Sequence, residues 1–300
     1  MPARIIDGNQ LAAAYRERIK SRVEAVRKVG GPVRLDAVLV ESGDNGARLY
    51  AENQARTCNQ LGIDYKLHRL AQGAGYDDIA GRVLLLSSQD DVHAIMMHLP
   101  LPEGVDTHRI QSLIDADKDV EGVNPANIGN IVYGRSSLAP CTALAVVKML
   151  ESVCGREDGR PFLRGKVAVV VGAGDVVGKP IAVLLMRQEA TVVSCNKWTP
   201  MLPELTRQAD VLVAAAGVAG LISAEMVKPD AIVIDVGVNR VKGADGKTRT
   251  FGDVSFDEVA KVAGWISPVP GGVGPVTVSM LLLNVLESAE RRVGMHARRQ

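Results

Sequence analysis

Apolar residues recur along the first part of the chain with two alternating periodicities. Short apolar runs typical of strands occupy residues 33–40, 63–70 and 92–97. Apolar positions three or four apart, the spacing of an amphipathic helix, occur in residues 9–28, 47–61 and 77–88. Strands separated by helical crossovers are typical of a parallel sheet, so we predict that this part forms an α/β domain.

A second series of strands follows a helix predicted over residues 142–153 and a polar, glycine-rich connection. Its strands are predicted at residues 167–171, 190–195, 209–216, 231–236 and 265–267. A last amphipathic helix, predicted over residues 278–291, is expected to pack back on the first domain. We therefore predict an α/β protein with domains at residues 1–141 and 142–276, and a C-terminal helical segment at 277–300.

One stretch at the start of the second series has a recognisable chemistry. The apolar strand 167–171 is followed by Gly172, Ala173 and Gly174, and then by a helix predicted over residues 176–187. Such a strand, glycine turn and helix place backbone N–H groups and a helix N-terminus where a pyrophosphate binds. The spacing to Gly178 is one residue wider than in the usual dinucleotide fingerprint, and a tight structural turn is the alternative interpretation.

Composition narrows the class of protein. The 300 residues, 47% of them hydrophobic and 23% charged, suit about two globular domains. A net charge of +1 and 3% aromatic residues do not indicate a nucleic-acid or membrane partner. The four cysteines lack metal-binding spacing and no secretory signal is visible, so we expect reduced thiols and a cytoplasmic location.

Several segments together resemble the methylenetetrahydrofolate dehydrogenase/methenyltetrahydrofolate cyclohydrolase family. They occur in the family's order along nearly the whole chain: Ile5-Ile-Asp-Gly8, Leu99-Pro-Leu-Pro102, Asp117-Lys-Asp-Val120, Pro140-Cys-Thr142, Val177-Gly-Lys-Pro180, Ile234-Asp-Val-Gly237, Asn239-Arg240 and Pro268-Val-Pro-Gly-Gly-Val-Gly-Pro275 with Thr277. The resemblance implies an N-terminal folate domain, a C-terminal Rossmann-like NADP domain with a cleft between them, and a homodimer. It implies oxidation of 5,10-methylenetetrahydrofolate and hydration of the product to 10-formyltetrahydrofolate, with no metal required.

The resemblance also assigns candidate residues. Those implied to contact the folate are Tyr50, Gln54, His98, Leu99, Pro100, Glu121, Pro270, Gly271 and Gly272. Tyr50 is expected to stack on the pterin, although a core aromatic on a helix face fits its spacing as well. Val238, Cys141 and Thr277 lie in segments that approach the nicotinamide in the family, with ordinary packing as the alternative.

Three polar positions of the implied folate site depart from the family. Gln54 stands four residues after Tyr50, where the family has lysine. His98 replaces a glutamine, and Glu121 replaces an aspartate that pairs with the amino-pyrimidine edge of the pterin. Hydride transfer needs alignment but no obligatory protein base, whereas hydration needs a proton carrier, and a glutamine does not titrate. We therefore expect dehydrogenase activity with much reduced cyclohydrolase activity.

Alternative interpretations of the altered site remain open. His98, whose ordinary pKa is about 6.5, is a possible substitute proton carrier, which would preserve both activities. A hydrogen bond to the folate, or a role at the end of the strand, is the simpler interpretation of His98. An altered-substrate or non-catalytic folate-binding relative is a further alternative. We predict no metal site, because His93 and His98 lie five apart on a strand and point to opposite faces.

The end of the second strand of the nucleotide domain bears on the choice of cofactor. An acidic residue after Cys195 would bind a ribose 2′-hydroxyl and would indicate NAD, but none is present. Lys197 is placed to meet a 2′-phosphate. We therefore predict NADP as the cofactor, with NAD as the alternative.

Overall fold

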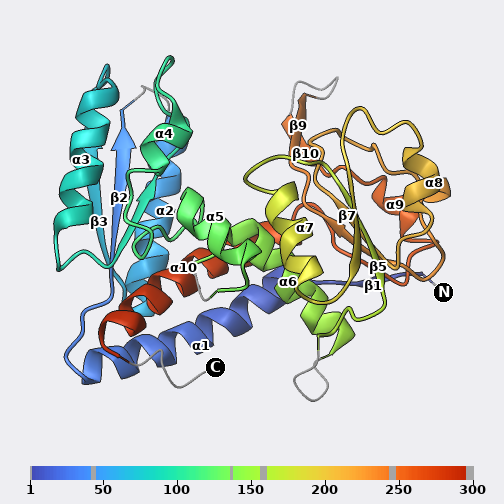
Figure 1. Ribbon diagram of the computed structural model, residues 1–300, viewed down its shortest axis with the longest axis horizontal. Coiled ribbons are helices and arrows are strands. Elements are labelled where there is room, and N and C mark those ends of the chain that lie inside the picture. The colour runs from blue at the N-terminus through green and yellow to red at the C-terminus, as the bar shows by residue number, and fades with distance from the viewer. Residues whose placement is uncertain (1, 42–44, 136–137, 156–160, 243–247, 295–300) are drawn as a thin grey trace. The chain divides into compact units, whose positions relative to one another are not determined.

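The computed structural model describes residues 2–41, 45–135, 138–155, 161–242 and 248–294, and its contacts divide the chain into two compact units (Figure 1). The described residues of 14–141, together with those from 281 onward, form one unit, which we call the three-stranded unit after its sheet. The described residues of 1–13 and 142–280 form the other, which we call the six-stranded unit.

The three-stranded unit is built on a short parallel sheet of order β3-β2-β4. Its strands are β2 (Arg34–Val40), β3 (Asp64–Leu70) and β4 (Ala94–Met97), connected through α2 (Asn45–Leu61) and α3 (Tyr76–Ser88). Successive strand side chains point to opposite faces, so Val38 and Met97, which pair in register, share a face. On that face they pack with Ile79 and Val83 of α3 in a buried apolar cluster. Two further helices follow, α4 (Thr107–Gln111) and α5 (Pro125–Val132).

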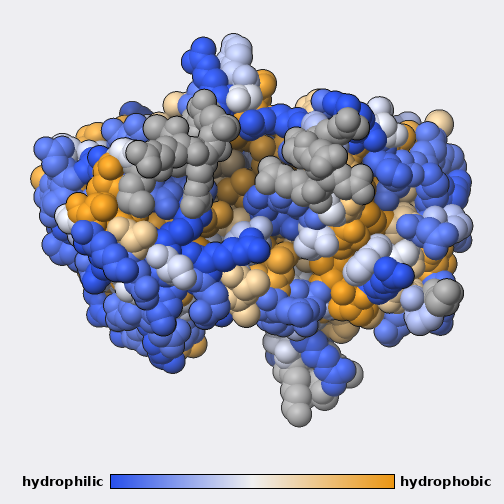
Figure 2. All heavy atoms as spheres, turned by 90° about the horizontal axis from the view of Figure 1, so that it is seen from below, coloured by the Kyte–Doolittle hydropathy of each residue, from blue (hydrophilic) through white to orange (hydrophobic). Residues whose placement is uncertain are grey.

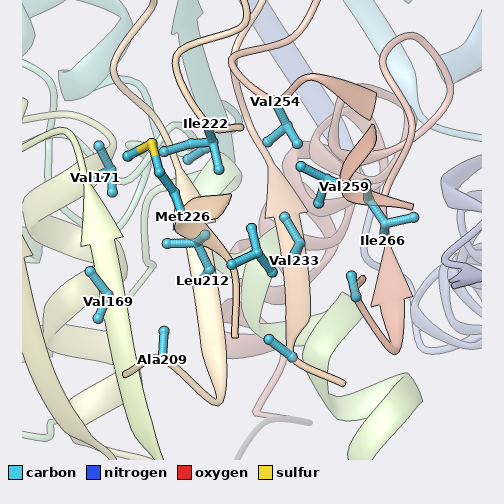
Figure 3. Close-up of a cluster of buried hydrophobic side chains, with 14 of the residues drawn as sticks. Val169, Val171, Ala209, Leu212, Ile222, Met226, Val233, Val254, Val259 and Ile266 are labelled. Carbon is cyan, nitrogen blue, oxygen red and sulfur yellow. The ribbon is translucent and has the colours of Figure 1, made fainter. Parts of the chain in front are cut away.

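The six-stranded unit has a parallel sheet of order β1-β11-β8-β7-β5-β6. Its strands are β1 (Arg4–Ile5), β5 (Val167–Val171), β6 (Thr191–Cys195), β7 (Val211–Ala214), β8 (Ile232–Asp235) and β11 (Trp265–Ile266). Its shorter helices are α7 (Gly178–Met186), α8 (Leu202–Thr206), the 3-10 turn η1 (Ala224–Met226) and α9 (Phe256–Val259). Apolar side chains of the central strands, among them Val169, Leu212 and Val233, form its buried core (Figure 3).

The connections in this sheet create a topological switch point at β5. From β5 the chain passes through α7 to β6 on one side, then returns through α8 to β7 on the other side. Ligands of open α/β sheets bind outside the carboxyl ends of the strands at such a point. The glycine turn that follows Val171 lies at this position.

Three long helices contain the points where the chain changes from one unit to the other. They are α1 (Gly8–Lys28), α6 (Cys141–Cys154) and α10 (Val273–Arg292). In α10, the Asn284 side-chain amide donates to the carbonyls of Val120 (2.8 Å) and Ala139 (3.0 Å), and Glu290 pairs with Arg22. These contacts connect the second half of α10 to the three-stranded unit.

The structure places several elements differently from the sequence expectations. Residues 1–13, expected in the first domain, group with the six-stranded unit because β1 pairs with β11 and Gly8 packs on the loop around Gly271. Helix α10 starts at Val273 rather than at residue 278, since a proline at its third position needs no hydrogen-bonded N–H there. The short helix α5 and the hairpin of β9 (Asn239–Lys242) and β10 (Thr248–Phe251) were not predicted.

The described helices contain no segment that is both long and apolar enough to cross a membrane. Hydrophilic residues are interspersed with hydrophobic ones over the face drawn in Figure 2.

Candidate functional site

Two groups of the predicted residues come together, one in each unit. In the three-stranded unit, Tyr50 and Gln54 come from α2, and His98 follows the last residue of β4. The Tyr50 and His98 rings meet edge to face, with their centroids 5.8 Å apart. The backbone N–H of His98 donates to the Val38 carbonyl (2.9 Å), which extends the ladder of the sheet by one residue. The structure therefore brings an aromatic ring and an imidazole together where strand β4 ends.

Tyr65 of β3 joins this group, although sequence reasoning did not single it out. Its hydroxyl lies 3.0 Å from Nε2 of His98. Burial raises the pKa of the Tyr65 hydroxyl, so the phenol stays protonated. Burial also lowers the pKa of His98 to about 4, so its imidazole is neutral at neutral pH. No motif contains Tyr65, and it reaches His98 across the sheet, in which β3 and β4 lie on either side of β2.

Gln54 is 5% exposed, and its carboxamide has no hydrogen-bond partner at either its nitrogen or its oxygen. Buried polar groups are nearly always hydrogen-bonded, and an unsatisfied one needs an explanation. A lysine at this position would put a charge in the same place, whereas the carboxamide is a neutral donor and acceptor. The unpaired amide has the properties expected of a ligand-binding group.

Glu121 is half-buried in the loop between α4 and α5, and its Oε2 accepts a hydrogen bond from the Met97 N–H (3.2 Å). Burial is the largest cause that raises the pKa of this carboxyl, to about 7, and the Met97 bond opposes it. The Glu121 charge in turn contributes, after burial, to the raised pKa of Tyr50. Glu121, Tyr50 and His98 therefore belong to one cluster, which we call the polar cluster together with Gln54 and Tyr65.

Lys118 and Asp119, which sequence reasoning did not single out, stabilise the loop that carries Glu121. The buried Asp119 carboxylate accepts from the N–H groups of Gly122 (3.1 Å) and Asn124 (2.7 Å). The Lys118 ammonium donates to the carbonyls of Ser87 (2.5 Å) and Gln89 (2.7 Å) at the end of α3. A buried charge is retained only with such partners, so these contacts fix the loop that carries Glu121. The charged Asp117–Val120 segment was noted, but its inward orientation was not.

Cys141, predicted near the cofactor, is buried beside the Glu121 loop in the three-stranded unit. Its Sγ donates to the Val120 carbonyl (3.2 Å), and the Asn284 amide lies 3.6 Å from the sulfur. Burial is the main cause that raises the pKa of this thiol well above its ordinary value. The Cys141 thiol therefore stays protonated, and whether it approaches a cofactor stays a prediction. Leu99 is 47% exposed, and Pro100, joined to it by a cis peptide bond, is also exposed.

The second group lies in the six-stranded unit around the glycine turn. Gly172 has φ +114°, and a Cβ there would lie 2.0 Å from the Ala215 carbonyl oxygen. A Cβ at Gly178, the first residue of α7, would lie 1.8 Å from the Gly172 oxygen. By contrast, a Cβ at Gly174 would meet nothing within 4 Å. Strand, turn and helix are thus packed as closely as backbone allows, and the exposed Gly174 leaves open space, a form that suits a bound pyrophosphate.

The loop after β6 carries the predicted cofactor-selecting residue. The Asn196 side chain accepts from the Trp198 N–H (2.9 Å), and the Thr199 hydroxyl accepts from the Asn196 N–H (2.9 Å). These bonds form a tight turn that exposes Lys197, whose ammonium lies 5.0 Å from the centroid of the Trp198 ring. Residues 195–199 contain no carboxylate to repel a phosphate.

The remaining predicted residues also lie in the six-stranded unit. The Gly8 N–H donates to the Gly271 carbonyl (2.9 Å), and a Cβ on Gly272 would lie 2.4 Å from the Pro268 oxygen. Val238 is 66% exposed, whereas the half-buried Thr277 hydroxyl bonds its own helix at the Val273 carbonyl (3.1 Å). Pro270 follows a cis peptide bond and is exposed. Whether these side chains contact a ligand stays a prediction.

Comparison with known proteins places this arrangement in a family. The family model for the tetrahydrofolate dehydrogenase/cyclohydrolase catalytic domain matches residues 6–121, and the model for the NAD(P)-binding domain of the same family matches residues 140–293. A protein from Methylibium petroleiphilum named bifunctional protein FolD is 43% identical over 98% of this chain and 100% of its own length. The protein of the same name from Moorella thermoacetica is 40% identical over 97% of this chain and 100% of its own.

Solved structures agree with the sequence matches. The bifunctional methylenetetrahydrofolate dehydrogenase/cyclohydrolase from Campylobacter jejuni superposes with a TM-score of 0.89 at 36% identity, covering 97% of this chain and 99% of that one. The Trypanosoma brucei dehydrogenase-cyclohydrolase, solved with an NADP cofactor and an inhibitor, gives 0.87 at 33% identity, covering 98% and 99%. The sequence prediction of a two-domain α/β fold of this family is confirmed.

Proposed function

Because this chain belongs to the tetrahydrofolate dehydrogenase/cyclohydrolase family, we propose that it oxidises 5,10-methylenetetrahydrofolate to 5,10-methenyltetrahydrofolate with NADP. The observation that carries the proposal is the glycine turn after β5, where Cβ atoms at Gly172 and Gly178 would collide with backbone. The open space at Gly174, beside this close approach of strand and helix, supports a bound pyrophosphate over a tight structural turn alone.

The residues present fit NADP on two grounds. The turn leaves the space and the N–H groups that a pyrophosphate requires, and Lys197 offers a positive charge, with no carboxylate nearby, at the end of β6. The cofactor supplies the hydride acceptor. The role of the polar cluster is to hold the folate so that its methylene carbon is aligned, which needs no titrating protein group.

We propose that the second family activity, hydration of the methenyl product, is strongly reduced. The Gln54 carboxamide does not titrate, and His98, with its pKa lowered to about 4 by burial, is not a proton carrier near neutral pH. A full bifunctional enzyme is the second candidate. The observation that favours it is Glu121, whose pKa of about 7 allows proton exchange near neutrality.

Two assays on one purified sample test the proposal. NADPH formation from methylenetetrahydrofolate is followed first, and then the decay of methenyltetrahydrofolate with NADP absent. We expect dehydrogenase turnover, with hydration about 10²–10⁴-fold slower than in a bifunctional relative, the usual effect of losing a general acid–base group. If no NADPH forms, the proposed dehydrogenase activity is wrong, and the result favours a non-catalytic folate-binding protein.

Gln54→Lys, with Gln54→Met as an uncharged control of similar length, tests the cause. We expect the lysine variant to gain hydration and the methionine variant not to, while both still reduce NADP. If the wild-type protein already hydrates the methenyl compound as fast as Gln54→Lys does, residue 54 is not the limiting group.

We also propose a homodimer that works in a reducing, cytoplasmic compartment. The proposal of a dimer is based on the resemblance to a family that is typically dimeric. The proposal of a reducing compartment is based on the four free cysteines, of which three are buried. Light scattering on the eluted protein, with twice the chain mass expected and a monomer contradicting it, tests the assembly.

A further inference from the structure

His98 is held between two tyrosines of different elements. Tyr65 of β3 lies 3.0 Å from Nε2, and the Tyr50 ring of α2 meets the imidazole edge to face. The histidine is 4% exposed, and its backbone N–H is bonded to Val38. Only one of its ring nitrogens, Nε2, has a hydrogen-bond partner among the residues that the structure describes. The unpaired nitrogen is therefore Nδ1.

The direction of the Tyr65–His98 hydrogen bond follows from what each group has available. His98 is the one acceptor for the Tyr65 hydroxyl among the described residues, so within the protein the hydroxyl satisfies its hydrogen by donating to Nε2. A neutral imidazole has one N–H and one acceptor nitrogen. If Nε2 accepts from Tyr65, the ring hydrogen is on Nδ1. The tyrosine thus selects one tautomer of the histidine.

The Nδ1–H group has no hydrogen-bond partner among the residues that the structure describes. The Gln54 carboxamide of the same cluster, buried on α2, has both of its polar atoms unpaired. Tyr50 precedes Gln54 by four residues, so the two side chains share a face of α2. The Tyr50 ring on that face contacts His98. Burying the Gln54 carboxamide without partners is costly, so its position in one cluster with the unpaired Nδ1–H indicates a polar ligand that bonds to both.

We propose that Tyr65 is a positioning residue which fixes His98 as the Nδ1–H tautomer, so that His98 donates a hydrogen bond to an acceptor atom of the bound folate. Gln54 bonds the same folate through its carboxamide. The folate as ligand rests on the proposed function, whereas the tautomer of His98 is a property of the protein alone. The site is then a fixed, uncharged pair of hydrogen-bonding groups rather than a proton relay.

The tautomer can be measured without any ligand. The full-length protein is labelled with ¹⁵N-histidine, and the His98 signals are assigned by their loss in His98→Gln. Protonated and unprotonated ring nitrogens differ in ¹⁵N shift, so the spectrum at neutral pH reports which one carries the hydrogen. We expect a single form protonated at Nδ1. A form protonated at Nε2 would overturn the proposal, and because no activity is measured, this result is independent of the proposed enzyme function.

Tyr65→Phe tests the positioning role, and Tyr133→Phe, at a residue that is 80% exposed, is the matched control. In Tyr65→Phe we expect the Nε2–H form to appear, and the KM for methylenetetrahydrofolate to rise about 3–10-fold, the effect of one hydrogen bond, with kcat nearly unchanged. The control should change neither. Unchanged tautomer and KM in a folded Tyr65→Phe protein would contradict the role of Tyr65.

Discussion

The carboxyl of Glu121 makes the stability of the protein depend on pH in a predictable direction. Its pKa is raised from an ordinary value of 4.5 to about 7, chiefly by burial. The folded protein therefore holds this proton more tightly than the unfolded chain does. The folded state is favoured most below the unfolded pKa, and this stability is lost as the pH rises through the folded pKa.

The magnitude follows from the size of the shift. Between the two pKa values, one such group lowers the free energy of unfolding by about 1.36 kcal/mol for each pH unit gained. A pKa of about 7 in place of 4.5 therefore corresponds to a loss of about 3 kcal/mol of unfolding free energy. Glu121→Gln keeps an oxygen that accepts from Met97 but does not ionise. The variant should not suffer this loss, so above neutral pH it should be more stable than the wild-type protein by up to about 3 kcal/mol.

Urea unfolding of both proteins, at several values from about pH 5 to about pH 8, measures the difference. Other buried groups, such as Asp235 with its pKa raised to about 6 by burial, titrate in both proteins and cancel in the comparison. We expect the two curves of unfolding free energy to separate as the pH rises and to become parallel above pH ~7.5. Curves that stay parallel throughout would refute the reasoning, because Glu121 would then not be a carboxyl with a raised pKa.

Two further predictions concern the six-stranded unit. Gly172→Ala should destabilise the protein by roughly 2–4 kcal/mol in urea unfolding, because its Cβ would lie 2.0 Å from the Ala215 oxygen at φ +114°. Gly174→Ala, where a Cβ meets nothing within 4 Å, should cost less than about 1 kcal/mol, and equal losses in the two variants would show that the turn is not closely packed. Lys197→Glu should raise the KM for NADP at least about tenfold while changing that for NAD little, because only NADP carries the 2′-phosphate. Equal effects on the two cofactors would contradict the role of Lys197.

Patterns local in the sequence predicted much of the fold. The run Val167–Val171 was predicted and found as a buried strand, and the glycines after it were predicted and found as a turn before a helix. Regular spacing also located α2 and α3 within two residues of their observed bounds. Such elements are recognisable because burial on one or both faces imposes a period on neighbouring residues.

Elements whose partners are distant in the chain were not predictable in this way. Strand β1 has two residues and exists only because Trp265 and Ile266 pair with it. The segment around Gly8 was known to resemble the family, but its contact with the Gly271 loop was not. No period marks so short a strand, and its hydrogen bonds come from a strand near the other end of the chain.

The identities of Gln54, His98 and Glu121, and hence which positions have lost or gained a titrating group, were determined by the sequence alone. Their ionisation and hydrogen bonding were decided by the tertiary structure. The ordinary pKa of a histidine made His98 a possible proton carrier, yet burial moves that pKa to about 4, and Tyr65 from another strand occupies its Nε2. The physical reason is that desolvation and hydrogen bonding depend on which distant residues surround a side chain, and this is set only when the strands and helices pack.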